Sequence, residues 1–201
     1  MKRTNIKRLV SAALALPGAL MLYDWWSGAT WAMDLLHPSG EMAVRLMVLA
    51  MLPGPLVEGL GTKGFMGRFL RGWLMIRRNL GVGAFGYALL HLAFYAIDMT
   101  PSGMVDELPL PGIWTGWLAL FLLLPPASIS FDRAVRTLGA RWKLVQRLVY
   151  LALAAGLAHW VLLAWSPLPA LVHIAPLALA WALRGWKRRQ IRVSPSSRSS
   201  L

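Results

Sequence analysis

Long apolar segments alternate with strongly charged connections, and this alternation limits what the chain can fold into. Six segments approach the roughly 20 apolar residues that a membrane-spanning helix needs. They cover residues 8–26, 41–57, 78–97, 113–130, 147–165 and 170–186. Only 14% of residues are charged and 57% are hydrophobic, whereas a soluble domain has about 25% charged residues. The sequence therefore predicts an all-α integral membrane bundle of six helices.

The basic residues gather on one side of these segments. Residues 58–78 and 131–147 hold five Lys or Arg residues each. Residues 24–41 and 98–112 hold three acidic residues each and no Lys or Arg. Of the 21 Lys and Arg residues, only Arg45 falls on the acidic side. Because basic loops stay in the cytoplasm, we expect a multi-pass protein of the bacterial inner membrane with both termini cytoplasmic.

The two ends of the chain carry separate predictions. The first 26 residues begin basic and turn apolar like a signal peptide, but without a clear cleavage site they are expected to remain as the first helix. Residues 1–190 are predicted to form a single transmembrane domain, and residues 191–201 a disordered cytoplasmic tail. The topology accounts for the net charge of +13. Contact with anionic membrane lipid is therefore expected, and no nucleic acid.

Several kinds of chemistry are excluded or disfavoured. The chain has no cysteine, which excludes disulfides, thiolate metal sites, iron–sulfur clusters and a cysteine nucleophile. No serine–histidine–acid arrangement lies within the spans, so hydrolase chemistry is disfavoured and no catalytic residue is predicted. Two G-x-G-x-x-G patterns, at 59–64 and 81–86, follow no strand and so lack the context of a dinucleotide fingerprint.

Two histidines lie inside the spans at matched depth. His91 follows Arg78 by 13 residues, and His159 follows Arg147 by 12. At 1.5 Å per residue, each ring lies roughly 20 Å from the basic edge, on helices that run in the same direction. Two imidazoles at one depth on parallel helices are suited to ligate a haem iron from both sides. We therefore predict His91 and His159 as the metal ligands of a haem.

The neighbours of the two histidines fit a flat cofactor. Gly156 precedes His159 by almost one turn and leaves room for a macrocycle, while Tyr87, one turn before His91, is expected to pack against its edge. In the alternative interpretation, each ring bonds a carbonyl or hydroxyl group of a neighbouring helix. Ionisable groups inside a membrane tend to be functional, and the matched pair favours the haem. A zinc site is less attractive because no third ligand lies at that depth.

Three further polar residues lie toward the acidic side. His37, in the segment HPSGE, is expected either in a surface loop or as a proton-accessible or cofactor-contacting group. Arg45 has two candidate partners, which are Glu41 one turn earlier and a haem propionate, which a guanidinium suits. Nothing in the sequence around His173 indicates a site.

Three segments of the chain resemble the MsrQ/YedZ family of the ferric-reductase-like transmembrane group. They are HPSGEMAVRL at 37–46, RRNLGVGAFGYALLHL at 77–92 and RW…RLVYLALAAGLAHW at 141–160. The resemblance implies an electron-transfer subunit of an oxidoreductase, with haem b at His91 and His159, rather than a stand-alone enzyme. In that family, electrons come from a cytoplasmic NAD(P)H-dependent flavin reductase, by way of FMN. They pass to MsrP, a periplasmic molybdopterin-containing reductase of methionine sulfoxide.

One position departs from the family pattern. Gln146 stands where the family typically has a histidine, and glutamine is a poor haem ligand, so this position does not support a second haem on the basic side. A flavin or another redox centre near Arg77, Arg78 and Arg147 would shorten the distance from an outer haem to the cytoplasm. The rival prediction is a small transporter or assembly factor whose histidines are structural or relay protons.

Overall fold

The computed structural model describes residues 3–193, which form helices and connecting turns and contain no strand. The helices are α1 (Arg3–Trp26), α2 (Ala32–Met51), α3 (Pro53–Leu60), α4 (Gly64–Asp98), α5 (Pro101–Glu107), α6 (Pro111–Ser128), α7 (Asp132–Leu138), α8 (Ala140–Gln146), α9 (Leu148–Leu163) and α10 (Leu168–Val193).

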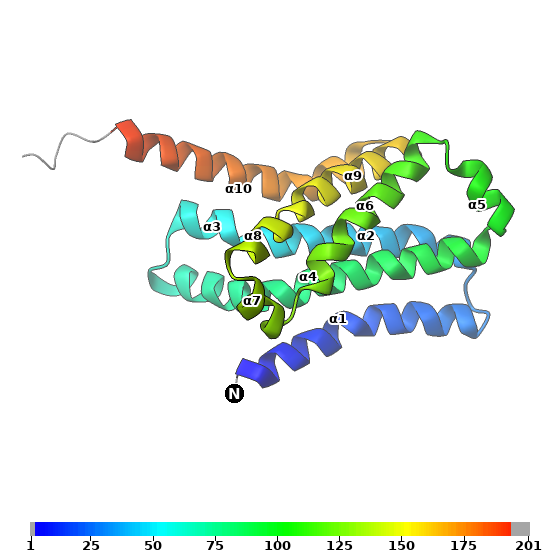
Figure 1. The fold of residues 1–201 in the computed structure, drawn as a ribbon, viewed down its shortest axis with the longest axis horizontal. Helices are drawn as coiled ribbons and strands as arrows, with labels where there is room; N and C mark the ends of the chain where they lie inside the picture. The colour runs from blue at the N-terminus through cyan, green and yellow to red at the C-terminus, as the bar shows by residue number, and fades with distance from the viewer. Residues whose placement is uncertain (1–2, 194–201) are drawn as a thin grey trace, which may run out of the picture.

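The long helices run back and forth along one axis of the molecule (Figure 1). α1, α4 and α9 lead away from the end at which the chain begins, and α2, α6 and α10 lead back to it. Five helices of the described chain are long and apolar enough to cross a bilayer. α5 and α6, which meet at an angle of 103°, form a sixth candidate together. The predicted all-α bundle of membrane helices is confirmed.

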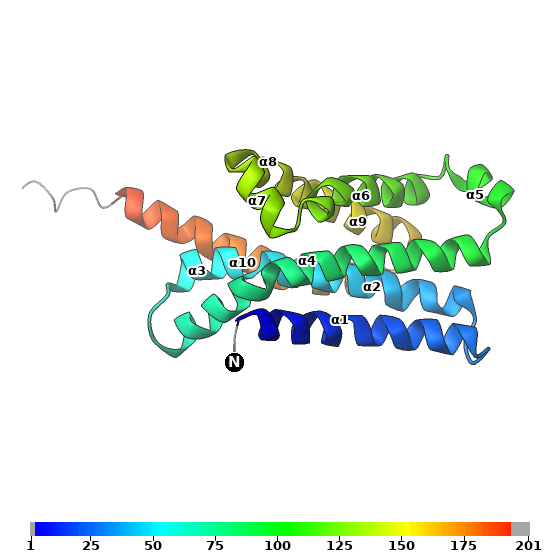
Figure 2. The ribbon, with the colours of Figure 1, turned by 60° about the horizontal axis from the view of Figure 1, so that its bottom comes forward.

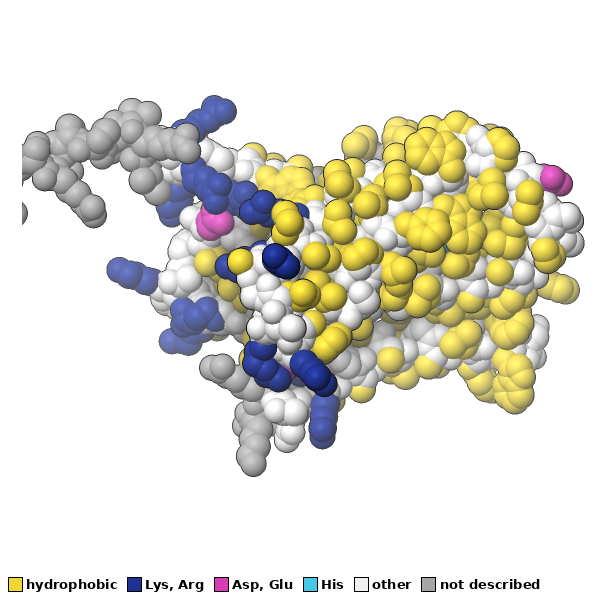
Figure 3. Space-filling view, viewed as in Figure 1, with side chains coloured by type: hydrophobic (Ala, Val, Ile, Leu, Met, Phe, Trp, Pro, Cys, Tyr) yellow, Lys and Arg dark blue, Asp and Glu magenta, His cyan; other side chains and the backbone are white. Residues whose placement is uncertain are grey.

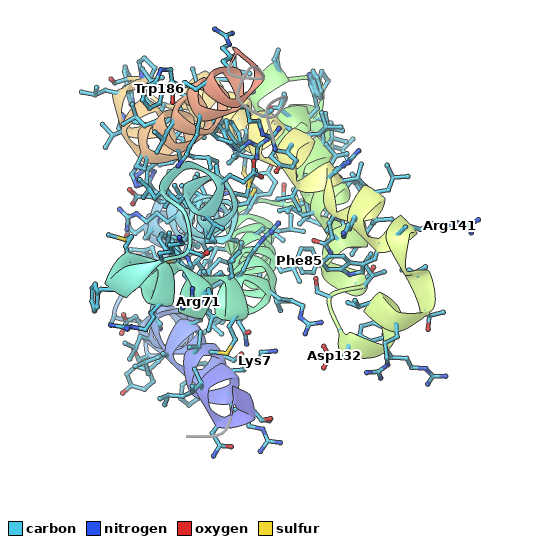
Figure 4. All side chains as sticks on the ribbon, turned by 90° about the vertical axis from the view of Figure 1, so that its left-hand side faces the viewer. Lys7, Arg71, Phe85, Asp132, Arg141 and Trp186 are labelled. Carbon is cyan, nitrogen blue, oxygen red and sulfur yellow. The ribbon has the colours of Figure 1, made fainter. Side chains whose placement is uncertain are left out.

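Charge divides the two ends of this bundle. Figure 3 shows Lys and Arg side chains gathered at the end where α1 begins and α10 finishes, while apolar side chains cover the rest of the visible face. We call this the basic end; Lys7, Arg71 and Arg141 are labelled there in Figure 4. At the opposite end, which we call the acidic end, α1 finishes at Trp26 and α4 at Asp98, beside the predicted acidic connections of residues 24–41 and 98–112.

Two helix pairs build the core. α2 packs along α4, and α6 packs along α9, whereas the two pairs touch each other much less. Figure 2 shows α6 and α9 on one side of α4 and α2, with α1 on the other. α1 is held to α4 by hydrogen bonds that Asn79 and Tyr87 donate to backbone carbonyls of α1. α10 packs mainly against α3 and α2. The sparse contact between the pairs leaves space inside the bundle.

The helices extend beyond the apolar segments that predicted them. α2 begins at Ala32 rather than at residue 41, so the HPSGE segment is helical. Within this helix the hydroxyl of Ser39, which follows Pro38, donates to the carbonyls of Leu35 and Leu36, at 2.6 and 2.9 Å. α4 begins at Gly64 rather than at residue 78, and most of the predicted basic loop is therefore helix. Apolar character predicts the bilayer-spanning part of a helix and not its polar extensions.

Breaks and ends also differ from the prediction. The second predicted segment is divided at Leu52, where Pro53 begins α3, because proline is favoured in the first turn of a helix. The fifth is preceded by the short helix α8, with Arg147 at the break. α10 extends to Val193, so residues 191–193 of the predicted disordered tail are helical. The rest of that tail, residues 194–201, lies outside the described residues.

Candidate functional site

A cavity of about 400 Å³ lies between the two helix pairs, in the half of the bundle toward the acidic end. α2, α4, α6 and α9 all contribute to its wall, which is mostly apolar. Sites for small molecules and cofactors have volumes of about 300–1,000 Å³, so this one is large enough for a cofactor. The titratable side chains in its wall are those of His37, Glu41, His91, Tyr95 and His159. We call it the first cavity.

The two histidines predicted as ligands come together in this cavity. The ring centres of His91, on α4, and His159, on α9, lie 5.9 Å apart, with an angle of 84° between the ring planes. Nδ1 of His91 lies 2.8 Å from the carbonyl oxygen of Leu36, on α2. Nδ1 of His159 lies 2.6 Å from the carbonyl oxygen of Gly112, on α6. The structure therefore places side by side the two rings that counting from the charged ends assigned to one depth.

These carbonyl contacts determine which nitrogen of each ring carries the proton. A carbonyl oxygen only accepts, so Nδ1 of His91 and of His159 is the donor in each bond. In a neutral imidazole the other nitrogen, Nε2, then keeps its lone pair. Within the described residues, Nε2 of neither ring takes part in a hydrogen bond. In both rings the lone pair of Nε2 is thus available to a metal ion, as it is in metal-ligating histidines.

The same contacts bear on the alternative interpretation of the histidines, in which each ring bonds a neighbouring helix. Both rings do so, but only through Nδ1. A bond at Nδ1 fixes the orientation of a ring and leaves Nε2 available for a metal. The two interpretations are therefore compatible, and interhelical bonding does not argue against ligation.

Glycines make room for both rings. A Cβ atom on Gly40 would lie 3.1 Å from Nδ1 of His91, and one on Gly116 would lie 2.6 Å from Nδ1 of His159. Neither glycine was predicted, because only the packing of α2 and α6 reveals which helix faces each histidine. Gly156, which was predicted, lines the first cavity, where a Cβ atom would meet only Ala119, at 3.9 Å.

Tyr87 and Arg45 lie outside the wall of the first cavity. Tyr87 is buried and its hydroxyl donates to the carbonyl of Leu14, on α1, at 2.9 Å, so it faces α1 and not the position expected for a porphyrin edge. A buried phenol needs an acceptor, and the carbonyl on α1 supplies it. Tyr95 lines the cavity instead, and its hydroxyl donates to Glu107 at 2.7 Å.

A polar cluster of Glu41, Arg45 and His173 lies beside the first cavity. Nη2 of Arg45 donates to Oε1 of Glu41 at 2.6 Å, which is one of its two predicted partners. Nε of Arg45 donates to Nε2 of His173 at 2.9 Å. His173 therefore belongs to a site that its sequence neighbours did not indicate. The missing information was the packing of α10 against α2.

His37 lies on α2 and lines the first cavity, so the surface-loop interpretation of this residue was wrong. Its ring centre is 5.9 Å from that of Trp160, in an edge-to-face arrangement. The centre of the ring of Trp160 is in turn 5.1 Å from that of His173. Trp160 thus connects the wall of the cavity with the polar cluster.

A second cavity, of about 490 Å³, lies toward the basic end and shares Met47 and Leu123 with the first. Its cationic lining residues are Arg77, Arg78 and Arg136, and its aromatic ones are Phe85, Trp142 and Tyr150. Figure 4 shows Phe85 between α4 and the half of the bundle that holds α6 to α9. Arg78 donates to Asp132, and this bond together with the guanidinium charge holds the pKa of that carboxyl below its usual range.

Gln146 lines the second cavity and donates from Nε2 to the carbonyl of Pro126 at 3.0 Å. No histidine is among the described residues that line this cavity, and Arg147, which was predicted near a second redox centre, is not among them either. The second cavity therefore offers cations and aromatic rings, but no imidazole.

Comparison with known proteins points to one family. The family model described as the ferric reductase like transmembrane component matches residues 39–157. The chain is 31% identical over 202 residues to a protein of Polaromonas naphthalenivorans, covering 94% of this chain and 89% of that protein. It is 34% identical to a protein of Deinococcus radiodurans, covering 82% and 83%, and 34% identical to one of Brucella anthropi, covering 73% and 66%. All three are named protein-methionine-sulfoxide reductase heme-binding subunit MsrQ.

Proposed function

The chain belongs to the MsrQ family of ferric-reductase-like transmembrane proteins, and on this basis we propose that it binds haem b as the electron-transfer subunit of a methionine sulfoxide reductase system. The pairing of His91 with His159 carries this proposal. The two rings meet beside a cavity of cofactor size, and each keeps Nε2 free while Nδ1 is bonded to a backbone carbonyl.

The spacing of the rings supports ligation of a single iron by both. With metal–imidazole bonds of about 2 Å, two rings whose centres lie roughly 6 Å apart would both be able to reach one metal ion. The observed separation is 5.9 Å. Because the chain has no cysteine, the thioether attachment of a c-type haem is excluded, which favours haem b.

The residues of the first cavity would hold the group and set its properties. His91 and His159 would supply the axial nitrogens, and the carbonyls of Leu36 and Gly112 would orient the rings and strengthen Nε2 as a donor. Gly156 would leave space for the macrocycle, and the apolar wall would exclude water. Arg45, beside the cavity, is our candidate for a contact with a propionate. The bound haem supplies one-electron transfer.

We propose the second cavity as the site of FMN. Arg77 and Arg136 would pair with its phosphate, and the aromatic side chains of Phe85 and Trp142 offer apolar contact to its ring system. The absence of an imidazole among the described lining residues favours a flavin over a second haem. Met47 and Leu123 line both cavities. These two side chains would therefore stand between a cofactor in the first cavity and a cofactor in the second.

The family resemblance suggests the donor and the acceptor, and the proposed orientation assigns each to one side of the membrane. The positive-inside rule assigns the basic end to the cytoplasm of a bacterium with the protein in its inner membrane. A cytoplasmic flavin reductase that uses NAD(P)H would then supply electrons at the second cavity. A periplasmic, molybdopterin-containing reductase of the MsrP type would receive them at the acidic end.

An absorption spectrum tests the proposal. Protein expressed with ample haem and purified in detergent is expected to show b-type bands in the reduced-minus-oxidised spectrum. His91→Ala and His159→Ala should each lose most of the haem, because a single remaining imidazole holds the iron from one side only. His37→Ala is the control, since it removes an imidazole from the same cavity but not a proposed ligand, and it should keep the bands.

Two outcomes would contradict the proposal. A wild-type protein without b-type bands would favour a small transporter or assembly factor. Full haem content in the double variant His91→Ala/His159→Ala would show that the iron is held elsewhere.

A further inference from the structure

The cluster of Glu41, Arg45 and His173 has the geometry of a proton-binding site. Nδ1 of His173 lies 2.6 Å from the carbonyl oxygen of Pro169, so this nitrogen carries a proton. Nε2 accepts a hydrogen bond from Nε of Arg45 at 2.9 Å, so this nitrogen carries none. The hydrogen-bond pattern is that of a neutral imidazole.

The same cluster also contains a partner for the protonated ring. Nε2 of His173 lies 3.2 Å from Oε1 of Glu41. In the neutral state both atoms are acceptors, and the guanidinium of Arg45 donates to each of them. A proton on Nε2 would turn this atom into a donor toward Glu41 and would remove the acceptor that Nε of Arg45 uses. Both protonation states of His173 therefore have hydrogen-bond partners in place.

The cluster is close enough to the first cavity to respond to a charge inside it. Glu41 belongs to the cavity wall, and so does Trp160, whose ring centre is 5.1 Å from that of His173. The side chains of Glu41 and His173 are only 19% and 18% exposed. Charges in such partly buried places interact more strongly than charges in water.

We propose that His173 takes up a proton when a haem in the first cavity is reduced, with Glu41 as the acceptor of the new hydrogen bond. This inference rests on the proposed haem binding. Reduction adds negative charge to the cavity, and a proton on His173 compensates for it. Linkage is reciprocal, so a proton whose binding is favoured by reduction must also make reduction easier. The midpoint potential of the haem should therefore fall as pH rises through the titration of His173.

The other ionisable groups around the cavity are possible competitors of His173 for this proton. They are His37 from α2, His91 and Tyr95 from α4, and His159 from α9. Nδ1 of His91 and of His159 is committed to a carbonyl, and Nε2 of each is assigned to iron, so neither ring is free to titrate. The hydroxyl of Tyr95 already donates to Glu107, at 2.7 Å. His37 is the remaining competitor, and the experiment must separate it from His173.

The test is a redox titration of the haem bands in the detergent-purified full chain, from about pH 5 to pH 8, where histidine titrates. The wild-type midpoint potential should fall as pH rises. Its slope should be no steeper than the slope produced when one proton is taken up with each electron. In His173→Gln the slope should disappear, because the amide oxygen can still accept from Arg45 but does not titrate. His37→Gln should keep the slope.

A pH-independent potential in the wild type, a persisting slope in His173→Gln, or a slope that vanishes only in His37→Gln would each overturn the inference. If His173→Gln fails to bind haem, the pH dependence of the potential in Glu41→Gln tests the inference instead. Without the carboxylate, protonated His173 loses the negative charge of its partner, so the sloping range should move to lower pH; an unmoved range would overturn the inference. Absent b-type bands would defeat the proposed function itself, whereas b-type bands with a flat potential would defeat only the proton site.

Discussion

His91 and His159 are held by the same local arrangement on two different helices. The carbonyl of Leu36 bonds His91, and Gly40, four residues later, is the glycine against which that ring packs. The carbonyl of Gly112 bonds His159, and Gly116, again four residues later, packs against that ring. Residues four apart lie on the same face of a helix, so a glycine at the later position removes the Cβ that would keep the ring from the carbonyl.

This arrangement predicts the effect of a single methyl group. Gly116→Ala would place a Cβ atom 2.6 Å from Nδ1 of His159, which must push the ring off its carbonyl. Loss of such orienting bonds weakens metal binding by about 10- to 100-fold, and we expect haem affinity to fall by that amount. Haem titration of the purified apoprotein, followed by absorption, measures the change.

Two further glycine-to-alanine substitutions, one without a contact and one with a milder contact, are compared with Gly116→Ala. Gly86→Ala, on the same helix as His91, meets no atom within 4 Å and should bind haem like the wild type. Gly40→Ala places its Cβ 3.1 Å from the ring of His91, a milder contact that should give an intermediate affinity. Unchanged binding in Gly116→Ala would mean that the carbonyl bond is not needed.

Only some of these residues could be predicted from the sequence. His91 and His159 were found because depth in a membrane helix can be counted from the nearest charged edge. His173 was missed because its partner Arg45 lies 128 residues away in the chain. Gly116 was missed because it meets His159 only through the packing of α6 against α9. For His37 the sequence left a surface loop and a cofactor-contacting position open, and only the packing of α2 shows that this residue lines the first cavity.

At the scale of the helices, ion pairs fasten the polar extensions that the apolar pattern did not predict. Glu58, on α3, contacts Arg188 at 2.5 Å and Arg184 at 3.7 Å, both on α10. Lys187 donates to the carbonyl of Gly59 at 2.6 Å. These contacts join the last turns of α10 to α3 at the basic end. Most of that part of α10 extends past the predicted span of residues 170–186, so packing within the bilayer does not hold it.

Removing the carboxylate should therefore loosen the end of α10. Glu58→Gln keeps the shape of the side chain but removes the attraction to Arg184 and Arg188. Exposed ion pairs contribute about 0.2–1 kcal/mol, which corresponds to a rise of roughly 1.5- to 5-fold in amide exchange. Hydrogen–deuterium exchange of peptides that cover residues 184–190 measures it. Asp106→Asn, at the acidic end, is the control and should leave these peptides unchanged; equal exchange in Glu58→Gln and wild type would contradict the prediction.

At the scale of the whole molecule, the two cavities follow one another along the bundle axis, in the space between the two helix pairs. The first cavity holds the histidines in the half toward the acidic end, and the second holds arginines in the half toward the basic end. Met47 and Leu123 belong to both walls. The histidines and the arginines therefore line two neighbouring cavities that share these two side chains.

The order and direction of the helices could be predicted from the sequence, because apolar length and loop charge are local properties. The pairing of α2 with α4 and of α6 with α9 could not, since it depends on which apolar faces fit together. Both cavities follow from that pairing. For this reason the sequence predicted two histidines at one depth but not the space beside them.

The orientation of the whole bundle gives the last prediction. The chain has no cysteine, so a single introduced thiol can be labelled without background. Ser102, on α5 at the acidic end, and Thr137, on α7 at the basic end, are both exposed. If basic loops stay in the cytoplasm, a membrane-impermeant maleimide added to spheroplasts should label Ser102→Cys. Thr137→Cys should react only after the membrane is permeabilised, and labelling in the opposite order would place the acidic end in the cytoplasm and remove the periplasmic acceptor from the proposed route.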